Sequence, residues 1–201
     1  MDRAVIQEIH TLFTKAENFC KSVEVFFSEG VVIPAINELR YCGKHLLDAH
    51  LAEDSRETEE QLRRAKAHCE RAIYDAAEVA ALLSLKAFSD FQSRYRKILI
   101  GDVIGDEYNT ICKDFHQLRT MTREPAADED KEQKYTELMQ VAQKGMDHLT
   151  MLESQEEELK KALMAQQKTE TARRKNQWGL WIGLFLSGVA AAAAVGQLMK
   201  T

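Results

Sequence analysis

The chain has 201 residues, of which 45% are hydrophobic and 29% are charged, with only nine glycines and two prolines. This composition favours helix and argues against disorder, collagen-like repeats or an all-β sandwich. The formal net charge of −5 argues against a protein that binds nucleic acid over its whole surface. We therefore expect an all-α protein whose length allows one sizeable core.

Two amphipathic helices are predicted at the start of the chain. Apolar residues recur at alternating steps of four and three from Val5 to Phe26, which is typical of one buried helix face. Gly30 is expected to end this helix. Pro34 suits the first turn of a second helix, because its fixed φ matches helical geometry, and the apolar pattern extends to about Leu51.

A third and a fourth helix complete the predicted bundle. Asp54 can cap the third helix, with Glu57 three positions later, and the apolar period continues to about Leu99. Two glycines at 101 and 105 predict a turn. The fourth helix is expected from Glu107 to about Met121.

A linker and a coiled-coil-like pattern follow the bundle. Pro125 and clustered acidic residues interrupt helix in the stretch TREPAADEDK. Beyond it, residues step by three and four as in the a and d positions of a heptad repeat: Tyr135, Leu138, Ala142, Gly145, Leu149, Leu152, Glu156, Leu159 and Leu163. Gly145 and Glu156 interrupt this seam, so either a second copy or the chain's own bundle can cover it. We favour a contact between copies.

The most specific signal is the uncharged stretch from Trp178 to Met199. At about 1.5 Å per residue it reaches roughly 33 Å as a helix, which matches a hydrocarbon core of about 30 Å. It predicts a transmembrane helix with two tryptophans at its start. Basic residues at 173–175 precede the span, whereas only Lys200 follows it, so the positive-inside rule places the N-terminal body in the cytoplasm.

Small residues recur every fourth position within this predicted span. One series is Gly179, Gly183 and Ser187, and the other is Gly188, Ala192 and Gly196. Small residues at this spacing let membrane helices approach closely, and we therefore expect the chain to form a homo-oligomer. Together, these signals divide the chain into a helical bundle (1–124), a linker (125–131), a long amphipathic helix (132–175) and a membrane helix (176–201).

Motifs for common cofactors and hydrolases are absent from the sequence. It contains no Walker loop, GxGxxG, HExxH or GxSxG pattern, and its four cysteines lack zinc-site spacing, so we expect neither a cofactor nor a metal. An arginine does precede three histidines by five to seven positions: Arg3 and His10, Arg40 and His45, Arg63 and His68. Because residues five apart point about 140° away from each other on a helix, such a pair needs a dimer groove or a helix end to meet.

The run RRAKAHCERAIYDAAEVAAL, from Arg63 to Leu82, resembles the helices of HEPN-domain proteins. These are small helical bundles with an R-x(4–6)-H motif, and many of them are metal-independent ribonucleases. The resemblance implies Arg63 and His68, or Arg40 and His45, as candidate catalytic residues. In such a site a histidine transfers the 2′-hydroxyl proton while an arginine binds the scissile phosphate.

A HEPN-like bundle joined to a membrane segment is similar to the membrane-associated Csx-type accessory proteins of RNA-targeting (type VI) CRISPR systems. This resemblance implies an antiviral defence effector in the bacterial inner membrane that oligomerises and permeabilises it, with membrane lipid and an RNA-guided effector or RNA as partners. Two alternatives stay open. The first is a membrane-tethered, metal-independent HEPN ribonuclease, and the second is a non-catalytic tail-anchored scaffold. Whether the chain is an enzyme therefore stays open.

Overall fold

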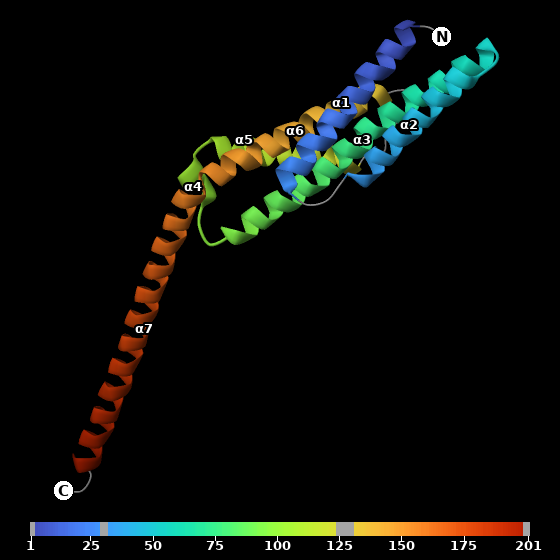
Figure 1. Cartoon of the computed structure of the whole chain (residues 1–201). Coiled ribbons are helices and arrows are strands. Elements are labelled where there is room, and N and C mark those ends of the chain that lie inside the picture. The colour runs from blue at the N-terminus through green and yellow to red at the C-terminus, as the bar shows by residue number, and fades with distance from the viewer. Residues whose placement is uncertain (1–2, 29–31, 124–130, 199–201) are drawn as a thin grey trace.

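The computed structural model of the chain describes residues 3–28, 32–123 and 131–198, without side chains at 131–132, 179–180 and 182–198. The described residues form seven helices and no strand, which confirms the all-α prediction. Figure 1 shows an elongated body of long helices, from which the last helix extends away to the C-terminus.

The first two helices lie close to their predicted ranges, and the third begins where it is predicted to begin. They are α1 (Arg3–Phe27), α2 (Ile33–Leu51) and α3 (Ser55–Arg94). Proline occupies the first turn of α2, as predicted. A carboxylate oxygen of Asp54 accepts a hydrogen bond of 2.7 Å from the backbone N–H of Glu57, which confirms the predicted cap of α3.

The centre of the body is α3, which contacts α1, α2, α5 and α6. Its buried face is rich in alanine, which lets these helices approach closely: Ala65, Ala72, Ala76, Ala77, Ala80 and Ala81 are fully buried. Larger apolar side chains from the surrounding helices fill the remaining space. Helix α3 is thus the element on which the rest of the body is assembled.

The chain between α3 and the next long helix differs from the prediction. Helix α3 ends at Arg94 rather than at about Leu99, and the predicted turn contains a short helix, α4 (Ile100–Ile104). Gly105 then adopts a φ of 83°, a conformation that favours glycine, and ends α4. Helix α5 (Glu107–Arg123) follows close to its predicted bounds.

The heptad pattern beyond the linker forms the buried face of α6 (Lys131–Ser154). Its side chains pack against α3 and α5 of the same chain, and five of them are buried: Leu138, Ala142, Met146, Leu149 and Leu152. Of the two predicted partners for this seam, a second copy and the chain's own bundle, the structure therefore shows the bundle for α6. Residues 125–130 of the predicted linker lie outside the described part of the chain, and its last residue, Lys131, begins α6.

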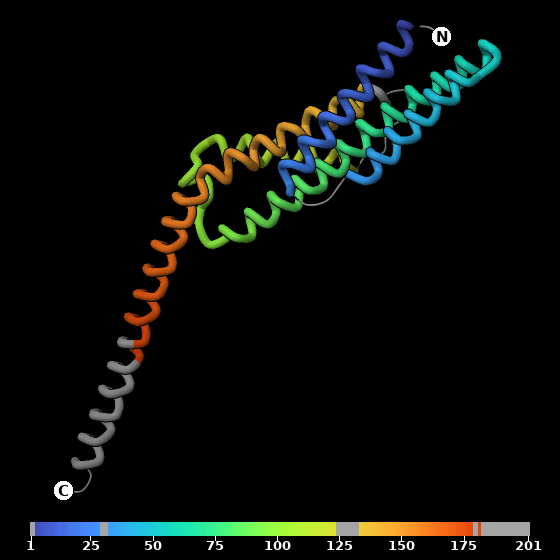
Figure 2. The backbone as a smooth tube through the Cα atoms, in the orientation of Figure 1, coloured from blue at the N-terminus to red at the C-terminus, as the bar shows by residue number. Residues whose placement is uncertain are grey.

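The predicted long helix from 132 to 175 is divided into two by a turn at Gln155. Helix α7 (Glu156–Leu198) begins there. Its first turns pack on the body, because Leu159 is buried against Tyr95 and Ile100. From Met164 to Trp178 every side chain is exposed, and Figures 1 and 2 show the helix running free of the body.

The predicted membrane span falls on the last part of α7. The backbone of this helix continues to Leu198, but the side chains from 182 onward, with those of 179 and 180, lie outside the described residues. Among the helical segments that are described, none combines the length and the apolar character needed to cross a bilayer. The six small residues predicted to mediate oligomerisation also lie outside the described side chains.

Candidate functional site

The structure brings two of the sequence-predicted histidines together. His45 projects from α2 and His68 from α3, and their rings stack with centroids 5.1 Å apart and planes 16° apart. Each side chain is 15% exposed. The antiparallel packing of α2 on α3 produces this contact, since it aligns positions far apart in the sequence.

A carboxylate and a guanidinium complete the surroundings of His68. Glu38, on α2, accepts hydrogen bonds from Nδ1 of His68 at 2.7 Å and from Nε of Arg71 at 2.8 Å. Nη2 of Arg71 lies 2.8 Å from the same nitrogen of His68. If Nδ1 donates its proton to Glu38, it cannot also accept one from Arg71, so we describe this approach as a close contact and not as a hydrogen bond. Partial burial acts to raise the pKa of Glu38, but the hydrogen bonds from Arg71 and His68 outweigh it and leave this pKa below its ordinary value.

Tyr41 and Gln61 border the two histidines. The Tyr41 ring lies 5.4 Å from the ring of His68, and Gln61 Oε1 lies 2.7 Å from Nδ1 of His45. We refer to this group as the α2–α3 polar cluster: Glu38, Tyr41, His45, Gln61, His68 and Arg71. It lies at the surface between the two helices, with Arg71 and Tyr41 exposed and the histidines mostly covered.

Neither Arg63 nor Arg40, the two arginines predicted to act with His68 and His45, lies against its predicted histidine partner. Arg63 binds Glu60 through Nε at 3.0 Å and Nη2 at 2.9 Å, and its side chain is 73% exposed. The separation of about 140° around the helix axis explains why Arg63 and His68 do not meet within one chain. Arg40 reaches only the edge of the cluster, since its guanidinium carbon lies 5.4 Å from the centre of the Tyr41 ring.

Arg71 is the arginine that contacts His68. It follows His68 by three positions, which is the spacing of neighbours on one helix face, and this signal is readable in the sequence. The hydrogen bond from His68 to Glu38 cannot be predicted from the sequence, because Glu38 lies on α2 and reaches His68 only through the packing of α2 on α3. The two histidines and the contact of Arg71 with His68 can therefore be predicted from the sequence. The role of Glu38, whose carboxylate binds both His68 and Arg71, cannot.

The polar cluster supports two kinds of chemistry. An imidazole that is hydrogen-bonded to a carboxylate is a side chain of the kind that serves as a general acid or base. An exposed guanidinium next to it can bind a phosphate group. The same contacts also join α2 to α3 as a satisfied polar network, in which each buried polar group has a partner. Among the described residues no group of histidine, cysteine and acidic side chains is arranged to bind a metal.

A second polar cluster lies between α5 and α6. The carboxylate of Asp114 accepts hydrogen bonds from Nζ of Lys144 at 2.8 Å and from Nε2 of His148 at 2.7 Å. His148 is 15% exposed, like His45 and His68, but its ring has no second histidine against it in the described structure. This cluster joins α6 to the bundle, and it provides a matched comparison for the α2–α3 polar cluster.

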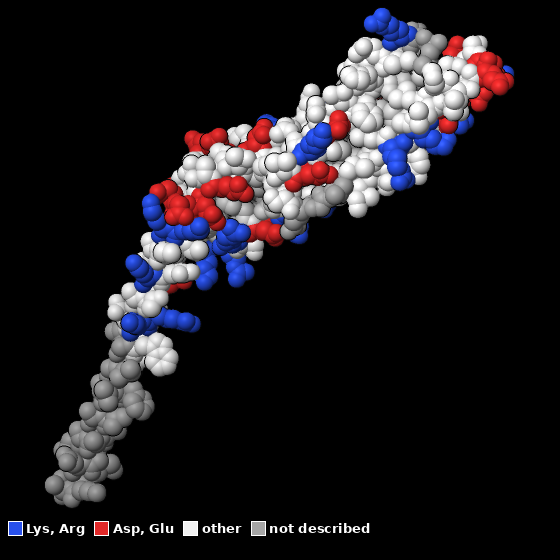
Figure 3. Space-filling view, in the orientation of Figure 1, with Lys and Arg blue, Asp and Glu red and all other residues white. Residues whose placement is uncertain are grey.

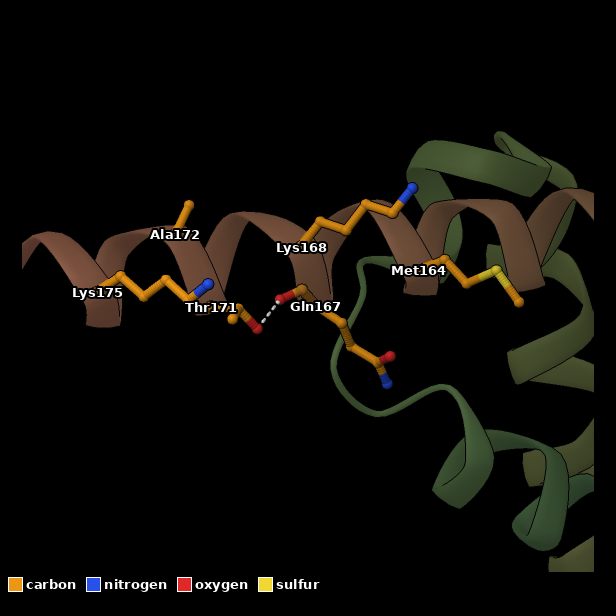
Figure 4. A pocket seen from close by; sticks show the side chains of 6 residues that line it. All are labelled: Met164, Gln167, Lys168, Thr171, Ala172 and Lys175. Carbon is orange, nitrogen blue, oxygen red and sulfur yellow. Dashed lines mark hydrogen bonds between the residues drawn. The ribbon is translucent and has the colours of Figure 1, made fainter.

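The hollow along α7 is less suited to a small-molecule site. Figure 4 shows that its six lining residues all come from one exposed helix: Met164, Gln167, Lys168, Thr171, Ala172 and Lys175. The Thr171 hydroxyl donates to the backbone carbonyl of Gln167 at 2.8 Å and so serves its own helix. A ligand there would be covered on one side only, whereas small-molecule sites surround most of the ligand surface.

Comparisons with family models, with curated proteins and with solved structures find no match to this chain.

Proposed function

We propose that this chain is a membrane-anchored helical effector of antiviral defence, which assembles through its C-terminal span and perturbs the bacterial inner membrane. The observation that carries this proposal is the uncharged stretch from Trp178 to Met199, whose residues as far as Leu198 belong to the last part of a helix that leaves the body. A body that carries a single exposed helix fits a protein held at a membrane by that helix. The short packed base of α7 fixes the body at one end of that helix.

Basic side chains support the orientation of the anchor. Lys168, Arg173, Arg174 and Lys175 lie on the exposed part of α7 just before the uncharged stretch, and Figure 3 shows blue side chains along this region. Such residues favour the cytoplasmic, anionic surface of a membrane. Trp178 and Trp181 are 69% and 72% exposed, which suits side chains at a lipid–water interface. We therefore place the body on the cytoplasmic side.

The two series of small residues in the proposed span support self-association. Copies of a single span must surround a pore or a lesion, because one helix alone encloses nothing. Close approach at Gly183 and Gly188 would supply the packing that lipid does not drive. An RNA-guided effector of a type VI CRISPR system is the proposed trigger, on the strength of the HEPN resemblance.

The test is the mass of the full-length protein in mild detergent, together with dye release from cells that express it with its trigger. We expect a discrete oligomer that Gly183→Ile and Gly188→Ile reduce to smaller species, because the added methylenes separate the helices. Ala193→Ile lies outside both series and should leave the oligomer intact. A wild-type monomer in detergent, or a protein found only in the soluble fraction, would contradict the proposal.

A second candidate function is a membrane-tethered, metal-independent ribonuclease. The stacked His45 and His68 beside Arg71 are the observation that favours it. RNA cleavage in the presence of a chelator should fall by about a hundredfold or more in His68→Ala, as expected for loss of a general base. His148→Ala removes an equally buried, carboxylate-bound histidine elsewhere and should retain cleavage. Absence of cleavage by the wild type would exclude this function.

The same assay distinguishes the two arginines. If the site forms within one chain, Arg71→Ala should lower cleavage far more than Arg63→Ala, because Arg71 alone contacts His68. The reverse order would indicate a groove between two copies, in which Arg63 of one chain faces the histidines of the other. Either result assigns the phosphate-binding residue.

A further inference from the structure

Two cysteine sulfur atoms meet beneath the α2–α3 polar cluster. Cys42, from α2, and Cys69, from α3, have Sγ atoms 3.2 Å apart. Both side chains are fully buried. Cys69 directly follows His68 in the chain, and Cys42 directly follows Tyr41, so the pair lies immediately behind the cluster.

The other two cysteines of the chain lie in different surroundings. Cys20 is buried in α1, where burial above all, with the charge of Glu24 adding to it, raises the pKa of its thiol to about 11. Cys112 is half-buried in α5. Of the four cysteines, all within the described residues, Cys42 and Cys69 are the pair whose sulfur atoms are in contact.

We propose that Cys42 and Cys69 are an oxidation site at which peroxide forms a disulfide that locks α2 onto α3. Joining sulfur atoms 3.2 Å apart at a bond length of about 2.05 Å requires them to approach by roughly 1 Å. In a reducing cytosol the pair stays as thiols until an oxidant arrives, which is the behaviour of a regulatory disulfide.

The chemistry has two steps and uses one peroxide molecule. The thiol of Cys42 first gives up its proton, its thiolate attacks one peroxide oxygen, the O–O bond breaks and a sulfenic acid forms, while the departing hydroxide takes up that proton and leaves as water. The second thiol then attacks the sulfenic sulfur, the S–S bond forms, and the S–O bond breaks with release of a second water. The two cysteines lose two electrons and two protons in total, and the peroxide is reduced to two waters.

The hydrogen bond between the two thiols favours Cys42 as the first nucleophile. Cys69 donates to the sulfur of Cys42, and this bond keeps the pKa of Cys42 below its ordinary value. The same contact, followed by burial, raises the pKa of Cys69. Cys42 is therefore the better thiolate, and Cys69 is placed to resolve the sulfenic acid.

A disulfide at this position would hold the polar cluster in its present arrangement. Glu38 and His45 lie one turn before and after Cys42 on α2, while His68 and Arg71 flank Cys69 on α3. A covalent bond between the helices prevents them from separating at this level. Any activity that requires α2 to move relative to α3 would stop on oxidation and return on reduction.

The experiment treats the full-length protein with hydrogen peroxide, alkylates the remaining thiols after denaturation, and maps the peptides by mass spectrometry. We expect the unalkylated protein to lose about 2 Da and a peptide from α2 to be joined to one from α3. Dithiothreitol should reverse the change. Cys20→Ala and Cys112→Ala should form the same cross-link, whereas Cys42→Ala and Cys69→Ala should not.

Peptide mapping of the wild type keeps the test decisive even where a buried cysteine variant fails to fold. The proposal is overturned if peroxide oxidises the half-buried Cys112 while Cys42 and Cys69 remain thiols. It is equally overturned if these two are converted to sulfinic acids without joining. Amide hydrogen exchange tests the lock: exchange in α2 should slow on oxidation in the wild type, and unchanged exchange in the cross-linked protein would refute that part.

Discussion

At Gly145, helix α6 lies close to side chains of α3 and α5. A Cβ atom added there would lie 3.3 Å from Cδ2 of Leu118 and 3.5 Å from Cβ of Ser84. Both neighbours are fully buried, so they have little space into which to move. The glycine that interrupts the apolar seam in the sequence is therefore what lets α6 contact α3 and α5 closely.

Replacing this glycine with a large residue should destabilise the body. We expect Gly145→Leu to lower the free energy of unfolding by about 1 to 3 kcal/mol, because the added side chain overpacks the contact. Gly43→Leu is the matched control, since Gly43 also lies within a helix but has no atom within 4 Å of an added Cβ. Urea denaturation of both variants measures the difference, and equal stability would contradict the argument.

Acid should weaken the contact between α5 and α6. Burial acts to raise the pKa of Asp114, but hydrogen bonds from Lys144 and His148 outweigh it and lower this pKa below the ordinary value of 3.8. Because the unfolded chain binds the proton more tightly, this carboxylate stabilises the fold above about pH 3.8 and loses that effect as pH falls through its lower folded value.

The variant Asp114→Asn isolates the contribution of this group. We expect it to cost about 1 to 2 kcal/mol at neutral pH, as for loss of charged hydrogen bonds, and to flatten the decrease of stability below pH 4. Thermal melts from pH 2.5 to 7 provide the comparison. A variant whose stability falls with acid as steeply as the wild type would assign the dependence to other carboxyl groups.

At the scale of elements, the turn at Gln155 separates a helix that packs along its length from one that packs only at its base. Helix α6 is buried along one face, whereas α7 depends on Leu159 against Tyr95 and Ile100. Arg94 adds an ion pair of 2.9 Å to Glu156 at the surface. The direction in which α7 leaves the body therefore rests on a small apolar cluster and one surface ion pair.

Removing the central side chain of that contact should release the base of α7. We expect Leu159→Ala to cost about 2 to 4 kcal/mol in this local contact, as for other leucine truncations in cores, and to expose the chain near Gln155 to protease. Met164→Ala, at a position that is 60% exposed, should change neither property. Limited proteolysis with mass spectrometry of the fragments measures both, and equal cleavage of the two variants would refute the role of Leu159.

At the scale of the whole molecule, the chain divides into a body that packs on itself and a helix that extends away from it. Figure 3 shows side chains of both charge signs scattered over the visible face of the body. Every described side chain from Met164 to Trp178 is exposed. The stability of the body and the attachment to a membrane are therefore expected to reside in different parts of the chain.

A truncated chain tests this division. We expect residues 1–165 to unfold at the same temperature as the full-length protein in the same detergent, because the removed part of α7 contributes no packing to the body. The truncated chain should also fail to bind vesicles of anionic phospholipid, whereas the full-length protein should bind them. A large drop in melting temperature would show that the end of α7 stabilises the body.

Much of the secondary structure could be predicted from local signals. Pro34 lies in the first turn of α2 because its fixed φ suits a helix, and Asp54 caps α3 by accepting a hydrogen bond from the backbone N–H of Glu57. The apolar period identifies which face of each predicted helix is buried. The apolar pattern of the third helix continues beyond Arg94 to about Leu99 and so predicts a longer helix, whereas the chain turns after Arg94 and then forms α4. Local periodicity does not show where neighbouring helices make the chain turn.

The candidate site could be predicted only in part. His45 and His68 stand out by residue type, and Arg71 shares a helix face with His68. These three residues can therefore be identified from the sequence. Glu38, thirty positions before His68, joins the site only through the packing of α2 on α3.

By itself, the sequence determined the all-helical class, the start signals of α2 and α3 and the buried faces of the predicted helices, because these depend on residues within a few positions of one another. The tertiary structure alone decided what each face contacts: that the heptad seam of α6 covers its own bundle, that Arg71 rather than Arg63 meets His68, and that Cys42 meets Cys69. The physical reason is that a helical period specifies the direction in which a side chain points, whereas its partner is set by the packing of distant segments.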